Sequence, residues 1–339
     1  MLKRIARGIR NHFEHKALVL MYHRVADLES DVWDLAVTPT HFEQHLQLLK
    51  QFGNVMPVAE LIQNLRRKTL PKRSIAITFD DGYADNYLAA KPLLEQYQLP
   101  ATFFIATATI DQDQEFWWDV LEYIFLCVNP LPSLFSYIIS DCKLAFDLSA
   151  EQHLTPELQQ KHYQWKAVSM PPPSQRATLF YEIWQLLKPL PYATQQEHLH
   201  HIRTWAGVAA SARPNHRSMT LHHLRDLSRN KLFTLGAHTL THPALSSHTS
   251  QFQTQELCAS MQYLTQASGQ EINLVAYPYG DYNNQTTAVT ATIGFHAAFT
   301  TSARPITKSS DIYQLGRFQT PNFNAQDFEK YLDHWFKHQ

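Results

Sequence analysis

The chain has 339 residues, enough for one large α/β domain with insertions or for two smaller domains. Its 29 Lys and Arg residues nearly balance its 30 Asp and Glu residues, so no global field would attract nucleic acid or an acidic polymer. No run of about 18 apolar residues predicts a transmembrane helix. We therefore expect function to reside in a specific site, with no nucleic-acid partner.

The first 16 residues are basic and predict a helix, because Leu2, Ile5, Ile9 and Phe13 recur at helical spacing. The segment lacks the continuous apolar stretch of a signal peptide, which favours a cytoplasmic location. One interpretation is an interfacial helix in peripheral contact with an anionic membrane. The other, which we prefer, is a solvated helix packed on the following domain.

Short apolar runs bounded by turn signals recur along the chain, with helical patterns between them. Several runs lack alternation, which predicts strands buried on both faces, and the strand–helix rhythm predicts a parallel sheet, open or closed into a barrel. The predicted strands are Ala17–Tyr22, Ser74–Phe79, Ala101–Ala106, Leu232–Gly236, Leu274–Tyr277, His296–Thr300 and Tyr313–Phe318. The clearest predicted helices are Thr40–Phe52, Tyr87–Tyr97 and Thr254–Ala267.

The stretch over residues 110–215 interrupts this rhythm and contains helical patterns near Ala177–Lys188 and Gln195–Trp205. It would form either one wall of a substrate cleft or a stabilising flap with its own small core. The predicted organisation is an N-terminal basic helix (1–16), an α/β domain (17–109 and 216–339) and a helical insertion (110–215).

Two motifs carry most of the chemical information: TFDDGY at 78–83 and HTLTHP at 238–243. Each follows a predicted strand, and the carboxyl ends of parallel strands meet at one edge of a sheet. Asp81, His238 and His242 would supply one oxygen and two nitrogens, a ligand set typical of catalytic zinc. Two histidines four residues apart are a weak signal among 19, but their position after a strand and the partner motif strengthen it.

Asp80 is then left to act as the general base that takes a proton from water. The alternative is that both aspartates only form the turn ahead of Gly82. Our candidate for the general acid is His23, which ends the first strand, although it could simply be a hydrogen-bonded histidine at the rim. Less favoured candidates for the acid are His222, His223 and His296.

Two further residues complete the candidate site. The amide of Tyr279, between Pro278 and Gly280, could donate to a developing oxyanion. Arg317, near the end of the last predicted strand, could hold Asp80 in its ionised form. For Arg317 a surface or structural ion pair is an equally good interpretation.

These segments resemble the polysaccharide deacetylase family (the NodB-homology domain, carbohydrate esterase family 4). The resemblance covers roughly residues 17–107 and 219–320, and AYPYG at 276–280 is similar to a bacterial subgroup that acts on glycans. It implies a distorted (β/α) barrel of about seven strands, with the insertion outside it. It also implies a divalent metal, usually zinc, on Asp81, His238 and His242, with Asp80 as base and Tyr279 as oxyanion donor.

The chain departs from the family pattern in two places. Many members carry an arginine two residues before the proline of the third motif, where this chain has Ala276, so Arg317 is our candidate for orienting Asp80. Many members use a late Leu-x-x-His histidine as general acid, and the corresponding tail QLGRFQTPNF has none. In some relatives the acid comes from the first strand, which fits His23.

We therefore predict a metal-dependent deacetylase that hydrolyses the acetamide of an N-acetylated sugar in a polysaccharide or glycan precursor. Trp117, Trp118 and Tyr282 could stack on sugar rings, whereas packing within the insertion is the preferred role of the two tryptophans. Two other hypotheses stay open. One is a related metal-dependent amidase or O-deacetylase on another substrate, and the other is a catalytically inactive glycan-binding module.

Overall fold

The computed structural model describes residues 15–338, whose contacts divide the chain into two units. Unit 1 comprises the described residues up to Asp27, Ala36–Ile110 and the residues from Met219 onward; unit 2 comprises Leu28–Leu35 and Asp111–Ser218. The helix predicted over residues 1–16 lies outside the described part except for its last two residues. The predicted domain boundaries stay predictions. Within residues 15–338, no helix is both long and apolar enough to cross a membrane.

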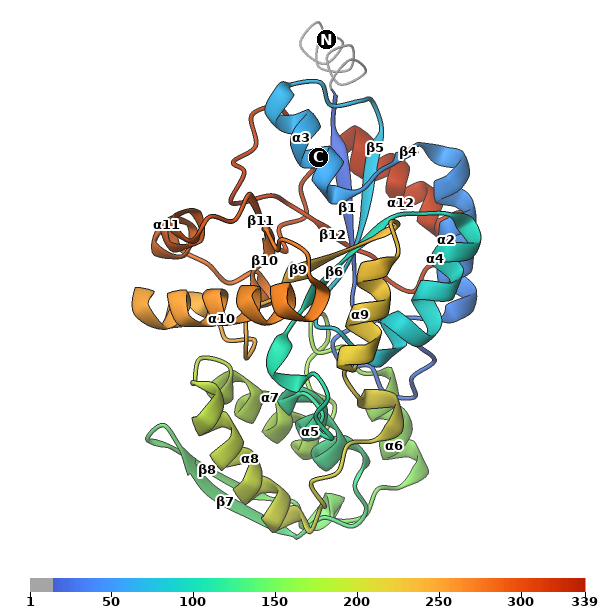
Figure 1. The fold of residues 1–339 in the computed structure, drawn as a ribbon. Helices are drawn as coiled ribbons and strands as arrows, with labels where there is room; N and C mark the ends of the chain where they lie inside the picture. Colours follow the sequence, from blue (N-terminus) through green and yellow to red (C-terminus); the bar gives the residue numbers. More distant parts are fainter. Residues whose placement is uncertain (1–14, 339) are drawn as a thin grey trace, which may run out of the picture. The chain divides into compact units, whose positions relative to one another are not determined.

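Unit 1 is built on a parallel sheet of eight strands, which Figure 1 shows. They are β1 (Ala17–Tyr22), β4 (Asn54–Val55), β5 (Ser74–Phe79), β6 (Ala101–Ile105), β9 (Phe233–Ala237), β10 (Leu274–Ala276), β11 (Ala297–Phe299) and β12 (Phe318–Gln319). Their order is β11-β10-β9-β6-β5-β1-β12, and β4 pairs with the start of β5. A separate parallel pair joins β2 (Arg24–Val25) to β3 (Ala36–Val37).

Helices connect these strands in the predicted rhythm. They are α2 (Pro39–Phe52), α3 (Val58–Arg67), α4 (Lys91–Tyr97), α9 (Leu221–Arg229), α10 (Ser250–Ser268), α11 (Asn284–Ile293) and α12 (Ala325–His338). Side-chain caps explain where several begin: Thr38 accepts the backbone N–H of His41 at α2, and Thr249 accepts that of Phe252 at α10. The helix predicted over Tyr87–Tyr97 starts as a π-helical turn, Asn86–Ala90, and continues as α4.

Successive residues of the strands enter two different cores, because side chains alternate across a sheet. Leu18 and Leu20 of β1 join the core shared with the outer helices, whereas Ala17 and Val19 join a core lined by smaller residues and by α3. Both faces of β1 and β5 are therefore buried, as the non-alternating apolar runs predicted.

The two edges of the sheet are bridged by the segment that leads into β12. Leu315 exchanges backbone hydrogen bonds with Ala298 and Thr300 beside β11, and Phe318 pairs with Leu20 of β1. The strand predicted over Tyr313–Phe318 is therefore wrong in extent, because this segment crosses from one edge strand to the other and follows neither for long. The predicted distorted (β/α) barrel is confirmed.

Unit 2 contains the helices α5 (Trp117–Glu122), α6 (Pro156–Gln164), α7 (Gln175–Leu187) and α8 (Tyr192–Ala206). The segment predicted as a helical insertion also contains an antiparallel hairpin of β7 (Leu134–Ile139) and β8 (Cys142–Asp147). Its two-residue turn, Ser140–Asp141, has positive φ at both positions, as a type I′ turn requires. The overlooked sequence signals were the run LFSYII, rich in aromatic and β-branched residues, and the turn-forming pair Ser140–Asp141 after it.

The outer core of unit 1 can be tested at Phe103, which is fully buried and stacks on Phe79 with ring centroids 5.0 Å apart. We expect Phe103→Ala to lower the free energy of unfolding by about 3–5 kcal/mol, because it removes buried apolar surface and leaves a cavity. The control is Leu88→Ala, whose side chain is 64 % exposed and whose effect should stay within about 0.5 kcal/mol. Equal denaturation midpoints for the two variants would contradict this description of the core.

Candidate metal centre and active site

The carboxyl ends of neighbouring strands bring the predicted site residues of unit 1 to one rim. Asp80 and Asp81 follow β5, and His238 follows β9. His23 follows β1, and Tyr279 lies in the turn after β10. Parallel strands place all of these positions at the same edge, as the sequence predicted.

The two adjacent aspartates leave β5 in different directions. Asp80 continues the strand, and its N–H donates to the carbonyl of Tyr22 (3.0 Å). Asp81 has a φ of 71°, in the left-handed region, and is followed by Gly82 at 89°. A non-glycine residue in this region stores about 1–3 kcal/mol of strain. The result is a turn that sends the carboxylates of Asp80 and Asp81 toward different partners.

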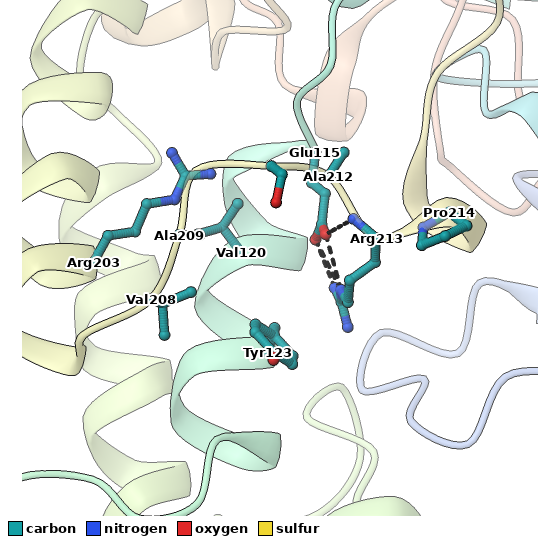
Figure 2. Close-up of a pocket in the computed structure, with 10 residues that line it drawn as sticks. Glu115, Val120, Tyr123, Arg203, Val208, Ala209, Ala212, Arg213 and Pro214 are labelled. Atoms are coloured by element: carbon teal, nitrogen blue, oxygen red, sulfur yellow. Dashed lines mark hydrogen bonds and ion pairs between the residues drawn. The ribbon is translucent and has the colours of Figure 1, made fainter.

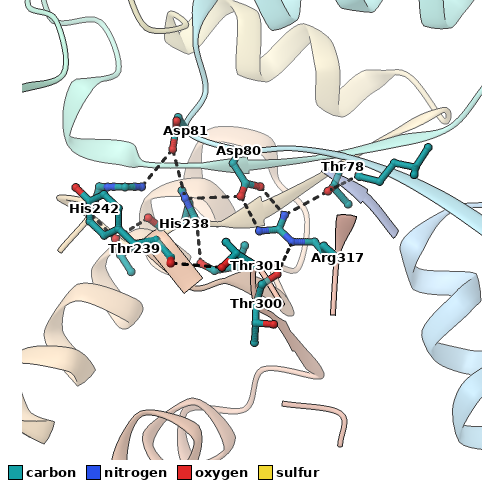
Figure 3. A network of polar contacts seen from close by, with 12 residues as sticks. Thr78, Asp80, Asp81, His238, Thr239, His242, Thr300, Thr301 and Arg317 are labelled. Atoms are coloured by element: carbon teal, nitrogen blue, oxygen red, sulfur yellow. Dashed lines mark hydrogen bonds and ion pairs between the residues drawn. The ribbon is translucent and has the colours of Figure 1, made fainter. Parts of the chain in front are cut away.

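Asp81 faces the two histidines of the second motif (Figure 3). Its Oδ1 lies 3.4 Å from Nε2 of His238 and 3.2 Å from Nε2 of His242. All three side chains are buried, and their candidate ligand atoms lie within 4.8 Å of one another. One oxygen and two imidazole nitrogens therefore converge on a single point.

The hydrogen bonding of His238 suits a metal ligand. Its Nδ1 donates to the carbonyl of Ala276 at 2.8 Å, because a carbonyl can only accept. In the neutral ring this bond leaves the lone pair on Nε2, the atom that faces Asp81. The tautomer that a metal requires is thus set by the backbone at the end of β10.

The charge balance of the cluster also fits a cation. Without a metal, His238 can donate from Nε2 to Asp81 only as imidazolium. Burial by itself raises the pKa of Asp81, but such hydrogen bonds from His238 and His242 outweigh it and hold that pKa well below its ordinary value. With both imidazoles neutral, as metal ligands are, the two buried carboxylates of Asp80 and Asp81 face one guanidinium, that of Arg317. A divalent cation on Asp81 and the two imidazoles would compensate the excess negative charge, which is costly to bury alone.

Asp80 forms a bidentate ion pair with Arg317, whose side chain is also buried. Nη1 donates to Oδ1 at 2.7 Å and Nη2 donates to Oδ2 at 2.6 Å. Burial raises the pKa of Asp80, but the charge of Arg317 outweighs it and lowers the pKa below its ordinary value. Arg317 is therefore a buried partner of Asp80 and not a surface ion pair.

Thr78 belongs to the same network, although we did not single it out from the sequence. Its hydroxyl donates to the carbonyl of Leu20 (2.8 Å) and accepts from Nη1 of Arg317 (3.2 Å). The signal that could have found it is its spacing, because Thr78 and Asp80 are two residues apart on a strand and so share one face.

His23 lies close enough to the carboxylates that its charge contributes to lowering the pKa values of Asp80 and Asp81. Its Nδ1 is buried and has no hydrogen-bond partner in the described part of the chain. Of the other acid candidates, His296 precedes β11 and so lies at the opposite end of the strands. His223 stacks on Tyr87 and caps α9 through the N–H of Thr220.

Tyr279 is also in the left-handed region, with a φ of 58° and a ψ of 4°. Its ring packs edge-on against the ring of His242, with centroids 4.5 Å apart. Gly280 follows at a φ of 65°, and a Cβ there would clash with Thr301. This turn therefore fixes the backbone of Tyr279 beside one candidate metal ligand.

The aromatic residues predicted to stack on sugars have other contacts in the structure. Trp117 and Trp118 are 3 % and 4 % exposed and pack against each other within unit 2. Tyr282 stacks on Tyr277, with centroids 5.3 Å apart. The two tryptophans therefore belong to a core, as the preferred interpretation of the sequence held.

Unit 2 has a cavity of its own, of about 290 Å³. Figure 2 shows Glu115, Tyr123, Arg203 and Arg213 among its lining residues. Glu115 accepts from Nη2 of Arg213 at 2.7 Å, so this carboxylate is already paired. None of the predicted catalytic or metal-binding residues lines this cavity.

Comparison with known proteins agrees with this geometry. Residues 67–125 and 206–298 match the family described as "Polysaccharide deacetylase". A protein of Bacillus subtilis (strain 168), YxkH, which is named as a polysaccharide deacetylase, is 34 % identical over 97 residues, 28 % of this chain and 33 % of its own length. A poly-beta-1,6-N-acetyl-D-glucosamine N-deacetylase of Staphylococcus aureus (strain MSSA476) is 29 % identical over 113 residues, 30 % of this chain and 39 % of its own.

Among solved structures, that of IcaB from Ammonifex degensii superposes with a TM-score of 0.57 at 16 % identity, covering 95 % of this chain and 97 % of that one. At this identity the likeness establishes the fold. The sequence matches span about a third of the length of the curated relatives. Both motifs, which the barrel assembles at one rim, thus lie within segments that match the polysaccharide deacetylase family.

Proposed function

We propose that this chain is a metal-dependent hydrolase that removes the acetyl group from an N-acetylated sugar of a polysaccharide. The main support is that the two aspartates at the end of β5 have different partners. Asp81 faces two imidazoles, and Asp80 faces a buried guanidinium. The match to the family model and the name of the Staphylococcus aureus relative support an N-acetylglucosamine polymer as the substrate class.

Asp81, His238 and His242 are the residues that would hold the metal, and zinc suits a set of two imidazoles and one carboxylate. When bound, such an ion lowers the pKa of water and polarises a carbonyl oxygen. Three protein ligands leave room in the coordination sphere for substrate or solvent.

Asp80 acts as the general base. Its carboxylate is ionised because Arg317 offsets the effect of burial, so it is ready to accept a proton. Oδ2 lies 4.0 Å from Nε2 of His238, which places the base beside the ligand set. Water adds to the acetamide carbon, and the proton that it releases passes to Asp80.

Tyr279 stabilises the tetrahedral intermediate, and His23 protonates the leaving group. The backbone N–H of Tyr279 donates to the oxygen of the tetrahedral intermediate. His23 then gives a proton to the amine nitrogen as the C–N bond breaks. The products are a free amino sugar and acetic acid, which ionises to acetate by releasing the second proton of the water to solvent. The proton on Asp80 then passes through solvent to His23, which restores both groups.

The roles of the metal and of Asp80 can be tested together by acetate release from N-acetylglucosamine oligomers. We expect chelation to abolish release and added Zn²⁺ or Co²⁺ to restore it. Asp80→Asn should lower kcat by about 10²- to 10⁴-fold while metal content stays unchanged, because the amide cannot accept the proton. Loss of metal from Asp80→Asn would instead exchange the roles of the two aspartates.

The same assay separates the other candidate functions. If acetate is released only from O-acetylated sugars, the protein is an O-deacetylase. If the oligomers bind but are not turned over, it is a glycan-binding module.

The general acid can be tested with His23→Gln, which keeps a polar side chain but cannot donate a proton as imidazolium. We expect kcat to fall by about 10²- to 10⁴-fold, with metal content unchanged. His296→Gln is the control, since this exposed residue lies at the other end of the strands and should leave kcat unchanged. Wild-type turnover in His23→Gln would move the acid to another residue.

The buried ion pair can be tested through stability. Arg317→Met leaves the carboxylate of Asp80 buried without its counter-ion, so the free energy of unfolding should fall by about 3–5 kcal/mol. The control is Arg73→Met, because Arg73 pairs with Asp333 at a similar distance (3.0 Å) but is 52 % exposed. A surface pair contributes only about 0–1 kcal/mol. If chemical denaturation gave the same loss in free energy of unfolding for both variants, Arg317 would have no special role in stability.

A further inference from the structure

The loop from His238 to His242 has a strained backbone. Thr239 has a φ of 66° and His242 a φ of 62°, although neither is glycine and Thr239 is β-branched. Such conformations persist only where surrounding contacts hold them. The contacts of this loop should therefore show what keeps His242 next to Asp81.

Hydrogen bonds from unit 1 hold the loop on several sides. The N–H of His238 donates to the carbonyl of Ile105 (3.0 Å), and the N–H of Ala108 donates to the carbonyl of Leu240 (2.8 Å). The N–H of His242 donates to the hydroxyl of Thr239 (3.0 Å). The N–H groups of Leu240 and Thr241 remain, and their acceptor lies on a helix outside the two motifs.

That acceptor is Glu256, in the second turn of α10 and only 5 % exposed. Its Oε2 accepts from the N–H of Leu240 at 3.0 Å and from that of Thr241 at 2.8 Å. Its Oε1 accepts from the hydroxyl of Thr241 at 2.8 Å. One buried carboxylate thus takes three hydrogen bonds from the two residues that precede His242.

We propose that Glu256 is a positioning residue that holds the His238–His242 loop in its metal-binding conformation. The inference deepens the proposed function, because it assigns a support to the same site. Among the described residues, the candidate metal cluster comprises Asp81, His238 and His242 and does not include Glu256. Without it, two backbone donors and one hydroxyl lose their acceptor, and the strained loop is free to relax into a conformation that carries His242 away from Asp81.

The test compares metal affinity in three variants of the full chain, stripped of metal and titrated with Co²⁺ without substrate. Glu256→Ala should bind Co²⁺ about 10- to 100-fold more weakly, the range seen when groups that orient metal ligands are removed. Glu256→Gln should stay within about threefold of wild type, since its amide oxygen can still accept both N–H groups. The matched control is Gln253→Ala, which removes a buried side chain one turn earlier that bonds to the carbonyl of His248, outside the loop. Its Co²⁺ affinity should be unchanged even if its thermal stability falls.

A folded Glu256→Ala variant with wild-type Co²⁺ affinity would overturn the proposal, as would an equal loss in Gln253→Ala. If Glu256→Ala fails to fold, Thr241→Val serves in its place, because it removes only the bond to Oε1. We expect this variant to bind Co²⁺ a few-fold more weakly and to exchange the amide hydrogens of residues 240 and 241 faster than wild type. Wild-type affinity and exchange in Thr241→Val would equally overturn it.

These measurements are independent of the reaction that the site performs. If the wild-type protein binds Co²⁺ but releases no acetate, the proposed activity fails and the role of Glu256 can still be read from metal affinity. If acetate is released but Glu256→Ala retains full Co²⁺ affinity, the activity stands and the positioning role fails.

Discussion

The buried ion pair between Asp80 and Arg317 is the interaction on which the candidate site depends. Asp80 ends a central strand, whereas Arg317 lies on the segment that bridges the two edges of the sheet, 237 residues away in sequence. Arg317 also donates through Nε to the carbonyl of Thr300 and lies over the ring of Phe104. Because both groups are buried, each charge needs the other, so the pair links closure of the barrel to the ionisation and orientation of Asp80.

The pair also explains how two adjacent carboxylates can do different work. The charge of Asp80 is neutralised by a fixed cation inside the protein, which fits its proposed role as a base and leaves no need of a metal. Asp81 has only imidazoles opposite it, which leaves a net negative charge that a divalent ion would satisfy. The left-handed backbone of Asp81 separates the two environments within a single residue step.

Most functional groups at the rim are held by the main chain or by buried polar groups. The carbonyl of Ala276 orients His238 by accepting from its Nδ1, and the hydroxyl of Thr78 accepts from the guanidinium of Arg317. Glu256 accepts from backbone N–H groups of the His238–His242 loop. Such support matters for catalysis, since small displacements of a base or ligand lose much of the benefit of positioning. Because these supports come from three different elements, the geometry of the site reflects the whole barrel.

The sequence by itself determined the parts that local patterns encode. Apolar runs predicted the strands, their buried faces and the rim at which Asp80, Asp81 and His238 meet, because strand ends and side-chain alternation follow from spacing alone. Tertiary structure decided what depends on contacts between distant segments: that Arg317, which had two equal interpretations, is buried on Asp80, that the β12 segment bridges two edges, and that Glu256 supports the histidine loop. It also grouped Leu28–Leu35 with unit 2. Periodicity describes the neighbours of a residue along the chain, whereas partners across a barrel are set by strand order and register, which no single segment specifies.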